Sequence, residues 1–181
     1  GSGAMAGPGR GGRGQGDPGA PSSETFTYTG SYYLYINGGT ITVNAGGDGL
    51  DANGAIEMTG GLVVVNGPTE QMNGALDYDG TFNISGGTLI AVGSAGMAQA
   101  PSAGSTQSSV LMGVGNQAAG TLIDIQNDAG ESLMALDPAK AYATILFSSP
   151  DLVQGAAYTL SLGGSEYGSF TQSSIVTTLG G

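Results

Sequence analysis

The chain repeats the stretch YLYINGGTITVN (residues 33–44) as AIEMTGGLVVVN (55–66) and again as FNISGGTLIAV (82–92). Each copy is an apolar run interrupted by a Gly-Gly pair, and a degraded form of this mark occurs at Ala119-Gly120. Successive marks are 22, 26 and 33 residues apart. A strand, turn and strand unit at this period is typical of a solenoid, in which each coil buries its apolar face only by stacking on its neighbours. The repeats therefore predict a parallel β-helix.

Superposing the repeats on their Gly-Gly marks predicts four columns of stacked, inward-facing side chains. The columns are Leu34, Ile56 and Phe82; Ile36, Met58 and Ile84; Ile41, Val63 and Leu89; and Val43, Val65 and Ala91. Residues between these positions point outward, because side chains alternate along a strand. The fourth repeat fits poorly, since Gln117 and Asp124 fall in inward columns, and a register change or bulge is expected near residues 110–125.

Composition divides the chain into parts. Residues 1–23 are rich in Gly and Pro with almost no apolar side chains, which predicts a linker or surface loop. Residues 24–181 are expected to form one β-helical domain. From about residue 131 the Gly-Gly mark is lost while alternating strands such as Ala143-Thr144-Ile145-Leu146-Phe147 continue. This last block is interpreted as a β-rich cap that covers the unpaired edge of the final coil.

Charge and residue usage limit the possible partners. The 181 residues include 14 acidic and only three basic side chains, a formal net charge of −11. This balance argues against nucleic acid or an anionic membrane and favours cations or neutral polymers. The chain has neither Cys nor His, which makes zinc and copper sites unexpected. No apolar run reaches the roughly 18 residues of a membrane helix, so membrane insertion is not expected.

A second repeat concentrates acidic side chains at the turn that closes each coil. Residues 49–54 (GLDANG) align with residues 75–80 (ALDYDG), which stacks Asp51 on Asp77 and Asn53 on Asp79 at about 4.8 Å. Two carboxylates at that spacing repel by roughly 3 kcal/mol at an effective dielectric near 20. A shared proton would relieve this repulsion, and so would a Ca²⁺ ion with its oxygens at about 2.4 Å and Asp48 as a further ligand. Alternatively, the Asp and Asn side chains merely cap tight turns by accepting hydrogen bonds from nearby backbone N–H groups.

Tyrosines are the candidate sugar contacts. Tyr33 and Tyr35 lie on the strand face opposite Leu34 and Ile36, where exposed rings would stack against sugar rings. The alternative is that they cover the open end of the solenoid. Tyr78 lies between two of the proposed calcium ligands and is a third candidate, with simple packing as its alternative.

At these residues the sequence resembles a known family. The stretches YLYINGGTITVNAGGDGLDANG (33–54), MTGGLVVVNGP (58–68), NGALDYDGTFNISGGTLIAVGSAGMAQAPS (73–102) and SPDLVQGAAYTLSLGG (149–164) resemble the bacterial extracellular carbohydrate-binding β-helix family, whose members bind cellulose and acidic sugars such as polygalacturonate. The resemblance covers roughly residues 24–181. It implies a right-handed parallel β-helix similar to that of pectate lyases, an extracellular or cell-surface location, and calcium held by stacked Asp turns. The matching positions are Asp48, Asp51, Asn53, Asp77 and Asp79.

The same residues argue against catalysis. Elimination at an acidic sugar needs a base, for which lyases of this fold use Arg or Lys, and only Arg10, Arg13 and Lys140 are present. Carboxylates that hold calcium stay ionised and are not free to act as acids in hydrolysis. The sequence therefore predicts a polysaccharide-binding protein that is not an enzyme, with a bound cation bridging protein and uronate carboxylates. The alternative is a self-assembling structural or cell-surface filament subunit, in which a second copy completes the first coil.

Overall fold

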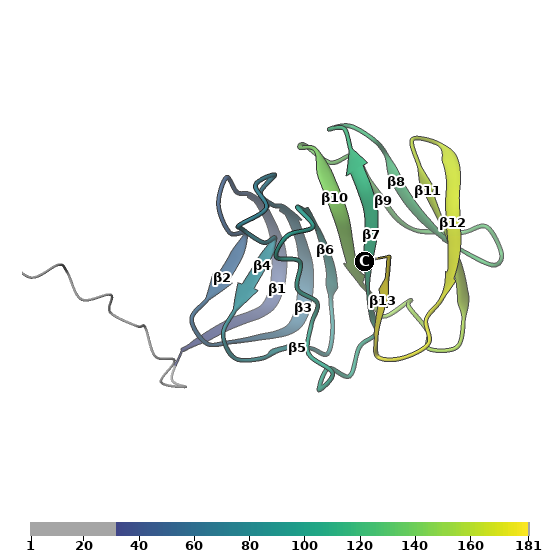
Figure 1. Ribbon diagram of the computed structural model, residues 1–181. Coiled ribbons are helices and arrows are strands. Elements are labelled where there is room, and N and C mark those ends of the chain that lie inside the picture. The colour runs from purple at the N-terminus through teal and green to yellow at the C-terminus, as the bar shows by residue number, and fades with distance from the viewer. Residues whose placement is uncertain (1–31, 181) are drawn as a thin grey trace, which may run out of the picture.

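A computed structural model describes residues 32–180, and all the regular elements in this range are strands (Figure 1). They form a seven-stranded sheet, a four-stranded sheet and a small two-stranded sheet. Within residues 32–180 there is no helix with the length and apolar character of a membrane span. Residues 1–23, expected as a linker or surface loop, lie outside the described part of the chain.

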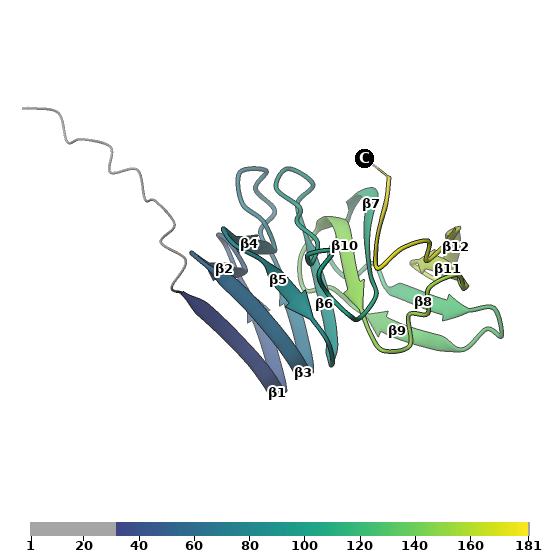
Figure 2. The ribbon, with the colours of Figure 1, turned by 90° about the horizontal axis from the view of Figure 1, so that it is seen from below.

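The three Gly-Gly repeats form three stacked parallel layers. Strands β1 (Tyr33–Asn44), β3 (Ala55–Asn66) and β6 (Thr88–Gly93) run side by side, and β5 (Phe82–Ile84) continues the third layer next to β3. Opposite them, β2 (Leu50–Ala52) and β4 (Leu76–Tyr78) pair in parallel as a second, small sheet (Figure 2). For these layers the four predicted columns are confirmed, because the strand registers pair Leu34 with Ile56 and Ile56 with Phe82, and likewise the other three columns.

Side chains in the middle of each column are the most deeply buried. Ile56, Met58 and Val63 have no exposed surface, and neither has Leu89 in the third layer. In the first layer Ile36 is buried, while Leu34, Ile41 and Val43 remain half-buried. The side chains of a layer are therefore fully buried only where the layer has a neighbouring strand on both sides.

Beyond β6 the predicted fold is wrong. The strand that pairs with β6 is not a fourth parallel coil but β10 (Tyr142–Ser148), which runs antiparallel to it. On its other side β10 pairs antiparallel with β7 (Ser109–Gln117), and β13 (Val176–Leu179) then joins β7 in parallel. The sheet order is therefore β1-β3-β6-β10-β7-β13. The molecule is an all-β protein with mixed and antiparallel sheets in a sandwich-like arrangement, not a parallel β-helical solenoid with a cap.

Two features end the coil stacking at β6. All seven residues of β10 are buried: Leu146 packs into the core of the coils, whereas Ile145 and Phe147 pack into the second core. A strand that is apolar on both faces is stable only in the middle of a covered sheet. In addition, the chain after β6 returns along β5, where the Ser102 N–H donates to the Phe82 carbonyl at 2.7 Å, so the position of a next coil is already occupied.

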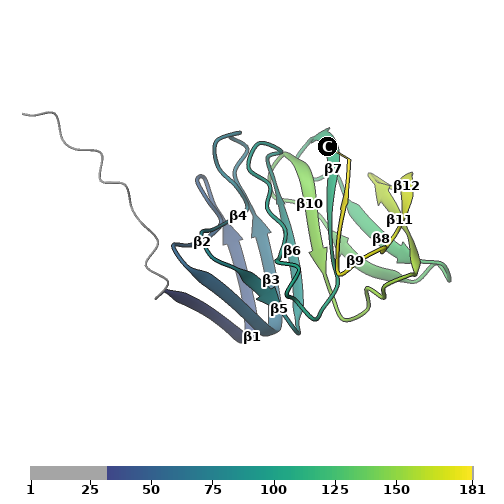
Figure 3. The same ribbon diagram turned by 60° about the horizontal axis from the view of Figure 1, so that its bottom comes forward.

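The second core lies between the long sheet and an antiparallel sheet. That sheet has the order β12 (Ser165–Thr171), β11 (Ala157–Leu162), β8 (Ile123–Asn127) and β9 (Ser132–Leu136), and it faces β7 and β10 (Figure 3). The fourth Gly-Gly mark, Ala119-Gly120, is a turn between β7 and β8. The expected irregularity near residues 110–125 is present, as a register shift of β7 against β10 between Gly113 and Gln117.

The stacked Gly-Gly turns provide a test of the layer geometry. Gly61 has a φ of 95°, and a Cβ there would lie 2.9 Å from the backbone of Gly38 and Gly39 in the layer below. We expect Gly61→Ala to lower the free energy of unfolding by about 1–3 kcal/mol, because it adds both strain and a backbone clash. Gly46→Ala is the control, since nothing lies within 4 Å of its Cβ position. Urea titrations in which both variants unfold at the same concentration would contradict this packing.

Candidate functional site

The predicted acidic turns do stack. In the β2–β4 pair Asp51 lies directly opposite Asp77, with Leu50 on Leu76 forming the buried side of the same ladder. The ladder continues past the strands, because the Asp79 N–H donates to the Ala52 carbonyl at 3.2 Å. Asn53 is therefore brought alongside Asp79, as the alignment of the two turns predicted. We call Asp51, Asn53, Asp77 and Asp79 the Asp ladder.

Asp48 approaches this ladder from the preceding turn. One of its carboxylate oxygens, Oδ1, accepts a hydrogen bond from the Gly74 N–H at 2.8 Å. This contact ties the turn before β2 to the turn before β4. Asp48 thus links two layers and does not cap its own turn, and its second oxygen has no partner among the hydrogen bonds of the described residues.

The surroundings of Asp77, in the ladder, disfavour the ionised form of its carboxylate. Partial burial raises the pKa of Asp77 above its usual value, and the negative charges of Asp48, Asp51 and Asp79 raise the pKa further. Asp77 is half-buried, while Asp51 and Asp79 are exposed. The pair of stacked carboxylates therefore stores repulsion that a proton or a cation would relieve.

The ligands of the ladder have the right chemistry for a hard cation, but there are few of them. All the side-chain ligands offered are oxygens, which is the preference of Ca²⁺. However, across residues 32–180 no three acidic side chains converge as a metal-binding group. A bound Ca²⁺ would need the Asp51 and Asp77 carboxylates together with turn carbonyls and water to reach its usual six to eight oxygens.

Tyr33 and Tyr35 form an exposed aromatic pair on β1. Their rings are stacked with centroids 5.6 Å apart and planes inclined by 14°, and the two residues are 56 % and 61 % exposed. The backbone beside this pair is bonded to the second layer, because the Tyr32 carbonyl accepts from the Ala55 N–H at 2.9 Å, two residues after Asn53. The pair lies on β1, whereas Asp51 and Asp77 lie on the facing β2–β4 sheet.

Tyr78 differs from the other two predicted sugar contacts. Its hydroxyl donates to the Ala100 carbonyl at 2.6 Å, and its ring meets Phe82 edge to face at 6.0 Å. The side chain is half-buried against the core of the coils. This geometry corresponds to the packing alternative for Tyr78.

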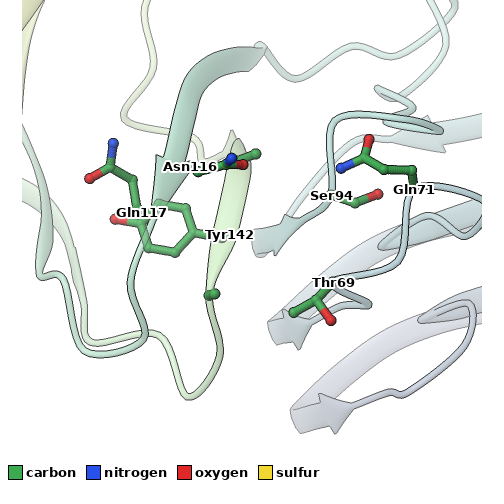
Figure 4. Close-up of a pocket in the computed structure, with 8 residues that line it drawn as sticks. Thr69, Gln71, Ser94, Asn116, Gln117 and Tyr142 are labelled. Atoms are coloured by element: carbon green, nitrogen blue, oxygen red, sulfur yellow. The ribbon is translucent and has the colours of Figure 1, made fainter.

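A small polar pocket that the sequence did not indicate lies where β6 and β7 end and β10 begins (Figure 4). Its volume is about 90 Å³, and its lining includes Thr69, Gln71, Ser94, Asn116, Gln117 and Tyr142. Burial raises the pKa of Tyr142 to about 12, and its hydroxyl donates to the Thr121 carbonyl at 2.9 Å. At neutral pH the pocket therefore offers neutral hydrogen-bonding groups and no acid or base. Its residues come from four separate stretches of sequence, and no local pattern connects them.

Comparisons of the chain with models of protein families, with curated proteins and with solved structures found no match. The site is therefore interpreted from its own geometry. Lys140, the one basic residue among residues 32–180, donates from Nζ to the Ala45 carbonyl oxygen. Arg10 and Arg13 lie outside the described residues.

The raised pKa of Asp77 predicts how stability depends on pH. A carboxyl whose pKa is raised by folding stabilises the fold when protonated, below the unfolded value of about 3.9, and this contribution is lost as the pH rises through the folded pKa. In chelator, Asp77→Asn should therefore raise the melting temperature at pH 7, and the gain should disappear below about pH 4. Differential scanning calorimetry at a series of pH values measures both parts.

Asp137→Asn serves as the control for this prediction, because Asp137 is exposed and lies outside the ladder. It should change the melting temperature little at any pH. A destabilised Asp77→Asn protein at pH 7 in chelator would mean that the ladder is held by hydrogen bonds to the carboxylate and not opposed by repulsion.

Proposed function

We propose that this protein is a non-catalytic polysaccharide-binding protein that takes acidic sugars such as polygalacturonate, and also cellulose, outside the bacterial cell. The observation that carries this proposal is the exposed, stacked pair of Tyr33 and Tyr35. Two exposed aromatic rings on a strand offer apolar faces that match the faces of sugar rings. Because both rings are already ordered against each other, little side-chain entropy is lost when a sugar stacks on them.

The Asp ladder supplies the second part of the proposal, a site for Ca²⁺. The protein carries a net charge of −11, so it would repel a polyuronate unless a cation lies between them. Asp51 and Asp77 are stacked, and Asp48 and Asp79 are close enough to raise the Asp77 pKa. A Ca²⁺ ion at this pair would relieve the repulsion and would present positive charge toward a uronate carboxylate.

The absence of catalysis is part of the same proposal. Within residues 32–180 the single ammonium group, Lys140, is engaged with the Ala45 carbonyl. Asp77, the ladder carboxyl whose pKa is raised, would be kept ionised by the proposed Ca²⁺ ion and would not serve as an acid. The proposed activity is therefore binding without cleavage.

The tyrosine pair is tested by a double substitution. Tyr33→Ala/Tyr35→Ala should weaken co-sedimentation with cellulose about tenfold, which corresponds to about 1.4 kcal/mol, because the exposed ring faces are removed. Tyr33→Phe/Tyr35→Phe is the matched control, since it keeps the rings and removes only the hydroxyls. Unchanged binding by the Ala variant, with a melting temperature equal to that of the unmodified protein, would place the sugar site elsewhere.

Calcium and catalysis are tested with polygalacturonate. The protein should co-sediment with this polymer in calcium, and chelator should release it, while the binding of neutral cellulose should change less. Incubation should yield neither new reducing ends nor unsaturated products. Products formed at enzymatic rates would overturn the non-catalytic proposal, and binding that chelator leaves unchanged would remove the cation bridge.

A further inference from the structure

We propose that the protein assembles head to tail, with residues 25–29 of one copy added as a strand to the open side of the sandwich of the next copy. In this arrangement Phe26 and Tyr28 are seated in the apolar groove between β12 and β13. This contact differs from the one expected from the sequence, where a second copy would complete the first coil. It is also independent of the proposed polysaccharide binding.

The receiving site lies at the end of the molecule formed by the sandwich. In the described part of the chain, β13 is the last strand of the long sheet and β12 is the last strand of the facing sheet. Both edges lie on the same side of the sandwich (Figures 1 and 3). An edge strand with free N–H and C=O groups is a template for another strand, and proteins commonly bind extended segments in this way.

A groove runs between these two edges. Its volume is about 270 Å³, and its apolar lining comes from both sheets: Met112, Val114, Leu160, Phe170 and Leu179. Tyr167, on β12, borders the groove and is 53 % exposed. The groove therefore combines two strand edges with an apolar lining, of which Leu179 is half-buried and the other four side chains are buried.

The long strand β7 is only partly covered on the groove side. β13 pairs with β7 from Ser109 to Met112, and β7 continues to Gln117. Just past the end of this pairing, the Val114 carbonyl accepts a hydrogen bond from the Tyr167 hydroxyl at 3.2 Å. A side chain thus takes the place of a main-chain partner, and an added strand that continues the ladder would replace this hydrogen bond.

The chain itself contains a segment with the required pattern. Thr25-Phe26-Thr27-Tyr28-Thr29 alternates aromatic and β-branched residues, which is typical of a strand with one apolar face. Phe26 and Tyr28 would share that face, and the three threonines would face solvent. These residues lie before Tyr32, outside the described range, and their sequence alone indicates the strand.

Geometry requires that the donated segment come from a second copy. β1 and β13 are five interstrand steps apart in the long sheet, roughly 24 Å at the usual spacing. Tyr28 precedes Tyr33, the first residue of β1, by five residues, which span at most about 17 Å when fully extended. Tyr28 therefore falls short of the groove of its own chain, and a contact between different surfaces of two copies repeats into a filament.

Charge favours the same contact. Arg10 and Arg13 are two of the three basic residues of the whole chain, and they precede the proposed strand. The neighbouring copy is strongly acidic, and Glu166 is exposed on β12 beside Tyr167. Docking the segment would bring the basic residues toward an acidic surface and should make assembly sensitive to salt.

Disulfide capture tests the contact directly, because the full chain has no cysteine of its own. A Tyr28→Cys protein mixed with a Leu179→Cys protein under mild oxidation should give a covalent heterodimer. One chain carrying both substitutions should give a ladder of covalent oligomers on a denaturing gel. Crosslinking requires Cα atoms within about 7 Å, so it reports contact at the residue level.

The controls make each outcome decisive. Tyr35→Cys mixed with Leu179→Cys should not crosslink, since Tyr35 lies on β1 at the other end of the sheet. Tyr167→Cys provides a second groove position, at an exposed site, in case Leu179→Cys fails to fold, and melting temperatures check every variant. Crosslinking no greater than in the Tyr35 control at both groove positions would overturn the proposal. So would an internal disulfide in a monomeric double variant. Neither result would bear on polysaccharide binding, because no polysaccharide is present.

Discussion

Stacking of apolar side chains between successive coils is the constraint on which the rest of this structure depends. A single layer cannot bury its own apolar side chains. Each residue in a column is covered by the residues above and below it. Ile56 and Met58, in the middle layer, are completely buried, whereas Leu34 in the first layer is only half-buried. Full burial of each such side chain is worth about 1.5–3 kcal/mol, so the columns fix the register of the layers.

The same register produces both parts of the candidate site. Once Leu50 lies on Leu76, Asp51 must lie on Asp77, and their repulsion is the cost of a stacking that the core imposes. The outward position of Tyr33 and Tyr35 follows from the inward position of Ile36, because side chains alternate along the strand. The core therefore fixes the acidic pair on β2 and β4 and the aromatic pair on β1, which are proposed to bind a cation and a sugar polymer.

The local repeat predicted the stacking of the first three layers well and the rest of the fold poorly, for one physical reason. Columns such as Leu34, Ile56 and Phe82, and the contact between Asp51 and Asp77, follow from the period of the sequence alone. β10 pairs with β6 although the two segments are about 50 residues apart in the sequence, and no sequence repeat predicts this pairing. Its run Ala143-Thr144-Ile145-Leu146-Phe147 shows an apolar strand but does not show that both faces are covered. The polar pocket around Tyr142 escaped prediction for the same reason, because its lining is assembled only by that pairing.

The most direct test of the account is an NMR titration of the isotope-labelled protein with an oligogalacturonide, first in chelator and then with calcium. The account predicts that with calcium the backbone amide signals of Tyr33, Tyr35, Asp51 and Asp77 shift together, while those around Tyr142 stay in place. In chelator the oligosaccharide should cause much smaller shifts at the Asp ladder. Shifts confined to the pocket around Tyr142, or no shifts at the tyrosine pair and the ladder, would contradict the proposal that these residues bind the sugar.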